Sequence, residues 1–507
     1  MARPNPTAPP AAAAIPPVPP MPNLPPPFAA AAGAGAGGPL GWMQSASRTV
    51  LEKGTTATSY LAEETLRAAR ASLYLTSHTL EGQVLPIFSS MSEWRQDIER
   101  SWMDALSGKK HIAEHARELG ERISSGSRYK KLVEGLGRQL FGSAVYAGEQ
   151  VLAKNDVFRL SYLPAKAGSP NTGVSLFFVG GFIPYGDKLF RFLPEASLFD
   201  RYLERGIPVY LMELAGDRHE IKAGLGKVTA EKQIDWIDEM AEVAFRHNGG
   251  RKMVLQGYCG SGVAATAYLA ARPKDADQKF KLATLFVTPI DAKKCSVFAE
   301  LVSNLPRSLV WTTLQRSQLL GGYLSGVEMW AGLDTGLKNV FSKTPLGRFA
   351  SGWKKPGFAK VQTLSDLDPM QRFELAGAYW ISVHNADRFP IPVELVRLAL
   401  HLYDKGASEA DGGDLGFTYK GKPVKLANIA QNSQLRMTAF FAGLDKLVQE
   451  ESGHVLAKLL GPRYRQLTHP TAAHVSYVCF PALWNPAHPK AFLPNPVDVI
   501  LEDYAKA

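Results

Sequence analysis

The sequence predicts an α/β protein built around a mostly parallel sheet, with helical segments before and within it. From about residue 155, short runs of apolar residues alternate with stretches of helical periodicity. Uninterrupted apolar runs are typical of parallel strands, because helices cover both faces of such a sheet. A second observation is a glycine-rich turn near the middle of the chain, between one such run and a helix of small residues.

Six apolar runs are the candidate strands of this sheet. They span residues 174–179, 207–212, 252–256, 282–287, 437–441 and 464–467. Helical stretches lie between the earlier runs, for example at residues 196–205 and from residue 261 onward. Strands that alternate with helices pair in parallel, so we expect these runs to form one sheet.

Length, composition and charge narrow the classes of partner. The 507 residues suffice for a large catalytic domain with attachments, and 45% hydrophobic with 21% charged residues is ordinary for a globular protein. The net charge of +10 favours anionic partners such as phospholipid or a CoA thioester. Because the basic residues are interspersed and form no run, we expect no nucleic-acid partner.

The cysteines and the absence of long apolar stretches point to a cytoplasmic protein. The three cysteines have neither metal-site spacing nor a CxxC pair, which predicts no metal site, no disulfide framework and a reducing compartment. No apolar stretch reaches the roughly 18 residues of a transmembrane helix. The apolar segment of a secretory signal is also missing from the N-terminal residues.

Residues 1–41 form a tail rich in proline, alanine and glycine. Arg3 is its one charged residue. Such a segment buries too little apolar area to offset its ordering entropy, so we expect it to be disordered or in polyproline II conformation. A spacer is the simpler interpretation, and a docking tail for a proline-binding module is the alternative.

Residues 42–150 predict an N-terminal helical region. Leucines recur there at seven-residue intervals, at Leu66, Leu73 and Leu80. A second helix is expected from Ser92 to Leu106, and Pro86 should break the chain between the two. An apolar surface for a partner subunit or hydrophobic particle is one interpretation. Helices packed on the catalytic domain are the other, which we favour.

Residues 151–507 predict the catalytic domain, interrupted by an insertion at about 300–425. The insertion has helical patterns and should form a cap over the edge of the sheet. It is also rich in aromatic residues, which we expect mostly to form its own core: Trp311, Trp330, Trp353, Tyr379 and Trp380.

The central turn reads Gly257-Tyr258-Cys259-Gly260-Ser261-Gly262. A strand, a tight turn with small residues two before and two after the nucleophile, and a small-residue helix make up the nucleophile elbow of the α/β-hydrolase fold. The helix N-terminus would stabilise a thiolate at Cys259. The amide of Gly260 would be one oxyanion donor, and the loop carrying Gly181 and Phe182 would supply the second. A buried structural cysteine is the alternative.

The fold supplies an acid and a histidine after later strands. Asp445 follows the run at 437–441, although an aspartate there is also typical of a turn or a helix cap. After the run at 464–467 two histidines compete, His469 and His474. We prefer His474, partly because His469 precedes a proline and has a restricted backbone, and partly because of the resemblance described next.

These motifs resemble those of the polyhydroxyalkanoate synthases, the polymerases of bacterial storage polyester. The family has the box Gly-x-Cys-x-Gly-Gly, and the segments around Asp445 and His474 occupy the places of its acid and histidine motifs. The segments Arg159–Pro164, Thr288–Asp291 and Asn385–Pro392 also resemble the family. Ser261 replaces a family glycine, and Lys446 stands where the family usually has a histidine.

The resemblance implies an acyltransferase with the triad Cys259, His474 and Asp445. It would polymerise 3-hydroxyacyl-CoA through a thioester on the cysteine, without a cofactor beyond the CoA thioester substrate. It also implies association with the polyester granule and leaves open a homodimer or a partner subunit. The alternatives are a depolymerase or thioesterase of the same fold, and a non-catalytic granule-associated protein.

Overall fold

The structure is a computed structural model that describes residues 55–182, 187–194, 196–216, 221, 224–325, 344–382 and 390–507. The predicted tail at 1–41 lies outside these residues, as do Trp330 and most of the segment at 385–392. The chain divides after residue 65 into two units, and of the first only a helical stretch from residue 55 is described. The second unit, residues 66–507, contains the sheet, the cap and the candidate site.

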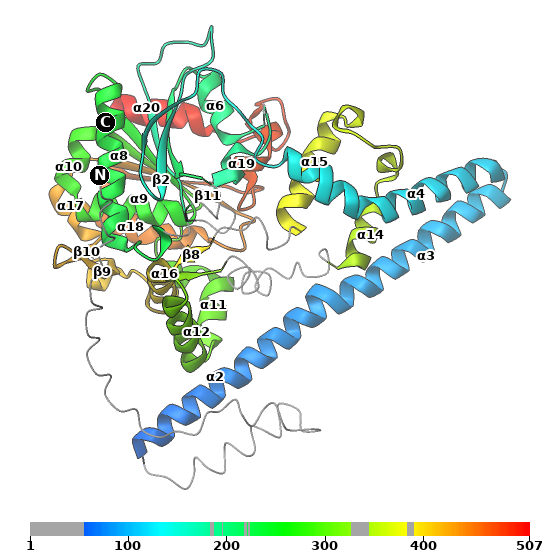
Figure 1. The fold of residues 1–507 in the computed structure, drawn as a ribbon, viewed down its shortest axis with the longest axis horizontal. Helices are drawn as coiled ribbons and strands as arrows, with labels where there is room; N and C mark the ends of the chain where they lie inside the picture. The colour runs from blue at the N-terminus through cyan, green and yellow to red at the C-terminus, as the bar shows by residue number, and fades with distance from the viewer. Residues whose placement is uncertain are drawn as a thin grey trace, which may run out of the picture. The chain divides into compact units, whose positions relative to one another are not determined.

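An eight-stranded sheet forms the centre of the second unit, with strand order β1-β2-β4-β3-β5-β6-β11-β12. Helices flank this sheet (Figure 1). Its strands are Gln150–Lys154 (β1), Phe158–Leu163 (β2), Leu176–Val179 (β3), Val209–Leu214 (β4), Met253–Tyr258 (β5), Phe280–Phe286 (β6), Arg436–Ala442 (β11) and Tyr464–His469 (β12). All six predicted runs are strands, and from β4 to β12 neighbours pair in parallel. The prediction of a mostly parallel sheet is confirmed.

The two strands β1 and β2 were not among the predicted runs. Strand β2 pairs antiparallel with both β1 and β4. Strand β1 lies at the sheet edge, and its side chains are exposed or half-buried, so it lacks the apolar run that marks a strand in sequence. Only the family resemblance of Arg159–Pro164 pointed to β2.

Each face of the sheet has its own hydrophobic core. Along β3, Phe177 belongs to the core on one face and Phe178 to the core on the other, because successive side chains of a strand alternate. The first core is covered by α8 (Ala230–His247), α9 (Gly260–Ala271) and α10 (Pro273–Lys279), and the second by α6 (Leu198–Glu204) and α20 (Pro496–Lys506). Burying one such aromatic or aliphatic side chain stabilises the fold by about 1.5–3 kcal/mol.

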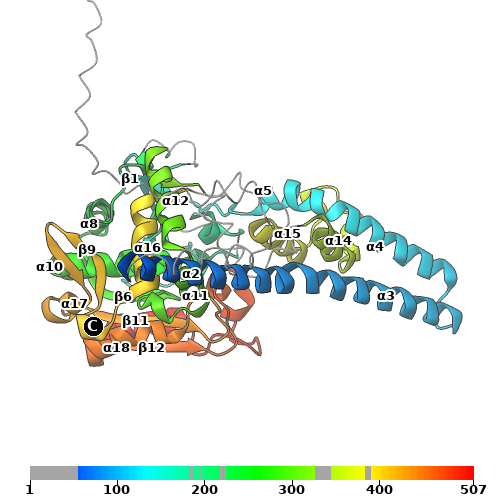
Figure 2. The same ribbon diagram turned by 90° about the horizontal axis from the view of Figure 1, so that it is seen from below.

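The described part of the insertion between β6 and β11 is largely helical, as predicted for a cap. Its helices are α11 (Ser296–Asn304), α12 (Arg307–Leu319), α14 (Pro345–Trp353), α15 (Pro369–Ser382), α16 (Val393–Lys405) and α17 (Ala427–Asn432). Helix α16 packs against both α11 and α12 (Figure 2). Among the aromatic residues, Trp353 and Tyr379 are buried, whereas Trp311 is 56% exposed.

The insertion also contains an antiparallel hairpin that helical patterning did not predict. Its strands are β9 (Asp414–Tyr419) and β10 (Lys422–Lys425), and Leu415 and Val424 belong to the core on the α9 face. The C-terminal part of the insertion therefore completes the catalytic domain, and the cap proper ends with α16.

The N-terminal region is helical, but the expected break at Pro86 is wrong. Helix α2 (Thr55–Thr79) continues through a π-helical turn (Leu80–Val84) into α3 (Leu85–Leu106). Pro86 is the second residue of α3, where the preceding wide turn removes the need for its missing N–H. The leucine stripe faces solvent within the described residues, with Leu73 being 72% exposed.

Helix α4 (Ile112–Leu132) ties this region to the cap. It packs on α14, and the Arg128 guanidinium donates hydrogen bonds to the carbonyls of Ala359 and Val361. Packing on the catalytic domain therefore holds for α4, and Trp94 of α3 also contacts Phe349 and Trp353 of α14. The leucine stripe of α2 and the π-helical turn stays exposed. None of the described helices is both long and apolar enough to cross a membrane.

Candidate functional site

Cys259 occupies the sharp turn between β5 and α9, with φ 50° and ψ −126°. Positive φ is strained for a residue with a side chain, and a nucleophile elbow imposes this strain to project the nucleophile from the turn. Gly257 has to lack a side chain, since a Cβ there would lie 2.4 Å from the Cα of Gly262. A Cβ at Gly262 would lie 2.0 Å from the Thr288 hydroxyl. The chain therefore has the backbone of the predicted elbow.

Ser261, which replaces the family glycine, braces the turn from inside. Its hydroxyl accepts a hydrogen bond from the Tyr258 N–H at 3.1 Å and donates one to the Tyr258 carbonyl at 2.9 Å. Both atoms are part of the turn that carries Cys259, and Ser261 is only 3% exposed. The serine is small enough for the elbow and adds two hydrogen bonds that glycine lacks.

Asp445 lies just past the end of β11 and is buried. Its Oδ1 accepts the N–H groups of Leu447 and Val448, at 2.8 and 3.0 Å, while its Oδ2 lies 2.7 Å from the Nδ1 of His474. One oxygen of Asp445 therefore closes a turn, and the other meets the imidazole that the predicted triad requires. Lys446, the departure from the family pattern, is exposed.

His474 is held by its backbone as well as by its ring. The Tyr258 hydroxyl, one residue before Cys259, donates a hydrogen bond to the carbonyl of His474, and the two rings meet edge to face with centroids 6.0 Å apart. The loop that carries the histidine is thereby fastened to the strand that carries the cysteine. Tyr258 is itself buried, so this hydrogen bond is shielded from water.

The electrostatics of the site favour the charged form of His474. Burial lowers the pKa of the imidazole, but the negative charges of Asp445 and Cys259 outweigh it and raise the pKa from 6.5 to about 10. The contribution of Cys259 means that its sulfur lies within electrostatic range of the ring. Thiol, imidazole and carboxylate thus come together at the carboxyl edge of the sheet.

His469, the competing histidine, faces another part of the chain. Its Nε2 lies 2.9 Å from the carbonyl of Ala491, and its ring packs edge to face on Phe492. As the last residue of β12, it pairs with Ala442 in the register of the sheet. The structure therefore pairs Asp445 with His474 and not with His469.

The two predicted sources of oxyanion donors differ in what their amides do. Gly260 is the first residue of α9, so its N–H has no acceptor within the helix and adjoins Cys259. The N–H of Gly181 instead donates to the Oδ1 of Asp187 at 2.7 Å. The expectation that Gly181 supplies an oxyanion donor is corrected by this bond, and Phe182, which lines the same cavity as Cys259, is left as the candidate.

A cavity of about 460 Å³ opens onto Cys259. Its lining is mostly apolar and comes from the elbow helix α9 and from the cap helices α11, α12 and α16. The lining includes Val263, Ala264, Phe298, Leu301, Val302, Leu305, Val310, Leu314, Leu395 and Leu398. Few polar side chains join them, among them Gln233, Thr313 and Tyr403. Such a cavity suits an apolar chain attached to a group that reacts at Cys259.

The strand order, the strained cysteine and the acid–histidine pair decide the fold. The chain has the α/β-hydrolase fold. Three solved structures with likeness to it are a carboxylesterase of the thaumarchaeon Nitrososphaera gargenis, the thioesterase domain of the curacin biosynthetic pathway, and a soluble variant of monoglyceride lipase from Saccharomyces cerevisiae.

The carboxylesterase is 13% identical, with 70% of this chain and 98% of the esterase covered and a TM-score of 0.36. The thioesterase domain is 11% identical, with 71% of this chain and 99% of the domain covered and a TM-score of 0.33. The lipase is 9% identical, with 65% of this chain and 88% of the lipase covered and a TM-score of 0.37. Likeness this weak says nothing about substrate or reaction. No family model matches the chain. No curated protein matches it either.

Two contributors to the site were missed in the sequence. Tyr258 was noted only as a residue of the central turn, and Asp187 was not considered, because neither position carries a short-range signal. The other two cysteines, Cys295 and Cys479, are buried, as expected for small apolar residues. Among the described residues no group of three or more His, Cys, Asp or Glu side chains is placed to hold a metal ion.

Proposed function

We propose that the protein is an acyl-transfer enzyme in which Cys259 carries the acyl group as a thioester. The observation that supports this most directly is the Asp445–His474 pair, 2.7 Å apart, next to a cysteine on a strained elbow. This is the order and placement of nucleophile, acid and histidine that nucleophilic acyl transfer uses on this fold.

The first half-reaction is acylation. The raised pKa of His474 favours the imidazolium, whose positive charge stabilises a neighbouring thiolate, the reactive form of a cysteine nucleophile. The Cys259 sulfur attacks the thioester carbonyl carbon, and the negative oxygen is met by the amides of Gly260 and Phe182. The bond from the carbonyl carbon to the CoA sulfur breaks, His474 gives its proton to that sulfur, and CoA leaves as a thiol.

The second half-reaction transfers the acyl group to a hydroxyl. His474, now neutral, takes the proton of the hydroxyl on a second 3-hydroxyacyl unit, whose oxygen attacks the Cys259 thioester. An ester bond forms, the bond to Cys259 breaks, and the thiolate–imidazolium pair returns. Repetition extends a polyester from 3-hydroxyacyl-CoA. The resemblance to polyhydroxyalkanoate synthases and the net charge of +10, which favours the CoA phosphates, support this substrate.

Hydrolysis is the second candidate. It uses the same thioester on Cys259 but takes water as acceptor, as a thioesterase or polyester depolymerase does. The mostly apolar cavity supports it, since the cavity suits one acyl chain and has few side chains to orient a second hydroxy acid. Access of water to the acyl-enzyme decides between the two reactions.

The experiment is to incubate the purified full-length protein with 3-hydroxybutyryl-CoA. Free CoA, insoluble polymer and soluble hydroxy acid are quantified, and the protein mass is measured for an adduct on Cys259. Polymer with a Cys259 adduct supports the polymerase, and free hydroxy acid with the adduct supports hydrolysis. If the wild-type protein released no CoA and formed no adduct, both reactions would be rejected and a non-catalytic granule-associated protein would be favoured. A granule-binding assay would then test that association.

The cavity makes a prediction about chain length that tests the same proposal. Val302 of α11 lines the cavity, so Val302→Trp should fill part of it and weaken turnover of long 3-hydroxyacyl-CoA more than of 3-hydroxybutyryl-CoA. Leu319→Trp in α12, at a position that is 87% exposed, is the control and should leave the ratio unchanged. An unchanged ratio in Val302→Trp would place the acyl chain elsewhere.

A further inference from the structure

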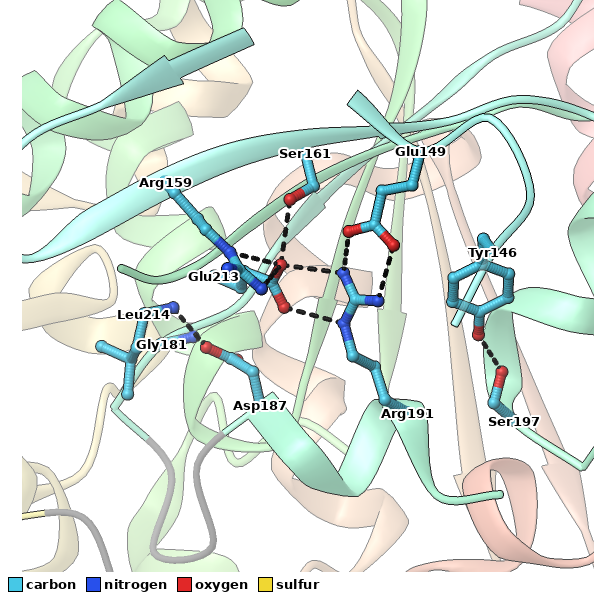
Figure 3. A network of polar contacts seen from close by, with 10 residues as sticks. All are labelled: Tyr146, Glu149, Arg159, Ser161, Gly181, Asp187, Arg191, Ser197, Glu213 and Leu214. Carbon is cyan, nitrogen blue, oxygen red and sulfur yellow. Dashed lines mark hydrogen bonds and ion pairs between the residues drawn. The ribbon is translucent and has the colours of Figure 1, made fainter. Parts of the chain in front are cut away.

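Asp187 is a buried carboxylate that the acyl-transfer steps above leave without a role. It begins the short 3-10 helix Asp187–Arg191 and is 6% exposed. Its Oδ1 accepts the N–H of Gly181 at 2.7 Å, and its Oδ2 accepts the N–H of Leu214 at 2.6 Å (Figure 3). One side chain therefore ties the loop after β3 to the end of β4.

The loop is shaped to meet this carboxylate. Gly181 has φ +117°, a conformation open to glycine but strained for other residues. A Cβ at Gly180 would lie 2.5 Å from the Oδ1 of Asp187 and 2.4 Å from the carbonyl of Met212. The glycine pair is thus required so that the backbone can approach both strand β4 and the carboxylate. The next residue, Phe182, lines the cavity beside Cys259.

We propose that Asp187 is a positioning residue whose ionised carboxylate fixes the Gly181–Phe182 backbone so that the Phe182 amide stabilises the oxyanion formed at Cys259. The inference rests on the proposed acyl-transfer function and assigns to it a group that does not touch the substrate. An ionised carboxylate suits the task, because both of its oxygens accept hydrogen bonds, whereas a protonated one loses an acceptor.

The charges around Asp187 belong to one buried network. Arg191 bonds both to Glu149, at 2.7 and 3.0 Å, and to Glu213, at 2.8 and 3.0 Å. Arg159 bonds to Glu213 at 2.9 Å from the other side, and the Ser161 hydroxyl donates to the same carboxylate (Figure 3). Arg191 is therefore engaged by both glutamates and Arg159 by Glu213, while Asp187 has backbone amides as its hydrogen-bond partners.

This surrounding makes Asp187 sensitive to pH near neutrality. Burial, followed by the charge of Glu213, raises the pKa of Asp187 to about 7, while the two backbone amides and Arg191 act in the opposite direction. As pH falls through this value, Asp187 takes up a proton and one of its two backbone hydrogen bonds weakens. The oxyanion loop is then held at one point instead of two, and acylation slows.

The test compares Asp187→Asn with the wild-type enzyme, using 3-hydroxybutyryl-CoA and measuring kcat, KM and the pH dependence of acylation. Asparagine keeps the shape and one acceptor oxygen, but its amide nitrogen cannot accept. We expect kcat to fall at least about tenfold, part of the 10²–10³-fold lost with a whole oxyanion donor. KM should change less than kcat. The fall in activity below about pH 7, which is the acid limb of the pH profile, should disappear.

Asp200→Asn is the matched control. Asp200 is also buried and accepts hydrogen bonds from the backbone N–H and hydroxyl of Ser197, at 3.0 and 3.1 Å. These bonds belong to the capping box of α6 and do not involve Gly181 or Phe182. It should lower the melting temperature by an amount similar to Asp187→Asn. It should leave kcat and the acid limb as in wild type.

The outcomes separate this inference from the proposed function. If the wild type forms no adduct on Cys259, the proposed function fails. If the wild type is active and Asp187→Asn keeps the wild-type kcat and acid limb, only the role of Asp187 is overturned. Should Asp187→Asn not fold, Asp187→Glu keeps the charge but displaces the carboxylate. A loss of kcat there supports positioning, and full activity overturns it.

Discussion

Replacing Asp445 by asparagine tests the catalytic assignment most directly. Asparagine can keep its Oδ1 on the amides of Leu447 and Val448, so the turn after β11 should survive. Its amide nitrogen, however, replaces the oxygen that lies 2.7 Å from the Nδ1 of His474. A donor now faces the Nδ1 of the ring and favours the tautomer that carries its proton on Nε2. A protonated Nε2 cannot accept the proton of the hydroxyl.

The magnitude follows from the charge that is lost. The shift of the His474 pKa from 6.5 to about 10 corresponds to about 5 kcal/mol in favour of the imidazolium, and the charge of Asp445 is the largest favourable contribution. Loss of the carboxylate should therefore lower the His474 pKa and reduce kcat by about 10⁴-fold, as in other histidine triads. The free energy of unfolding should fall by only about 1–3 kcal/mol.

CoA release from 3-hydroxybutyryl-CoA measures kcat, and chemical denaturation measures stability. Asp503→Asn is the control, because Asp503 is 5% exposed and bonds to Thr438 and Arg465 away from the site. It should lose comparable stability while keeping kcat within about threefold. If Asp445→Asn retained kcat within tenfold of wild type, the pairing of Asp445 with His474 would have no catalytic meaning.

Three further variants test the elbow. Cys259→Ala should abolish the acyl adduct and lower the His474 pKa, measured by NMR titration, because a negative charge that raises it is removed; an unchanged pKa would put the sulfur out of range. Gly257→Ala should prevent stable folding, seen by circular dichroism, since its Cβ would lie 2.4 Å from the Cα of Gly262. Ser261→Ala should reduce the free energy of unfolding by about 1–3 kcal/mol as two hydrogen bonds are lost, and an equally stable variant would contradict the bracing role.

The sequence predicted those parts of the fold whose signal is local. The six parallel strands are buried on both faces, so each appears as an apolar run, and the elbow appears because sterics restrict the residues around Cys259. Edge strand β1 and the hairpin β9–β10 have no such run. Pro86 misled because its effect depends on the π-helical turn before it, which periodicity does not reveal.

The candidate site was predictable to the extent that its members end strands. Asp445 and His474 follow β11 and β12, and parallel strands bring their carboxyl ends to one edge. The choice between His469 and His474 depended on which ring meets the carboxylate, a tertiary fact. Asp187 could not be found at all, because its role exists only once β3 and β4 lie side by side.

Asp187 and Asp445 are two buried carboxylates with different roles at the site: Asp187 positions the oxyanion loop, and Asp445 pairs with His474. Their different partners predict the shape of the pH profile. Both accept two backbone N–H groups, but an oxygen of Asp445 also meets an imidazole, whereas both oxygens of Asp187 are taken by amides. Burial and the charge of Glu213 raise the pKa of Asp187 to about 7, and the charges of Asp445 and Cys259 let His474 hold its proton up to about 10. Activity should rise through the first pKa, as the oxyanion loop is fastened, and fall through the second, as the proton for the leaving CoA is lost. The stability that the imidazolium contributes should likewise be present below pH 6.5 and lost as pH rises through about 10. Since Asp187→Asn should remove only the acid limb and Asp445→Asn should move only the alkaline limb to lower pH, a profile in which either variant altered the opposite limb would contradict this division of roles.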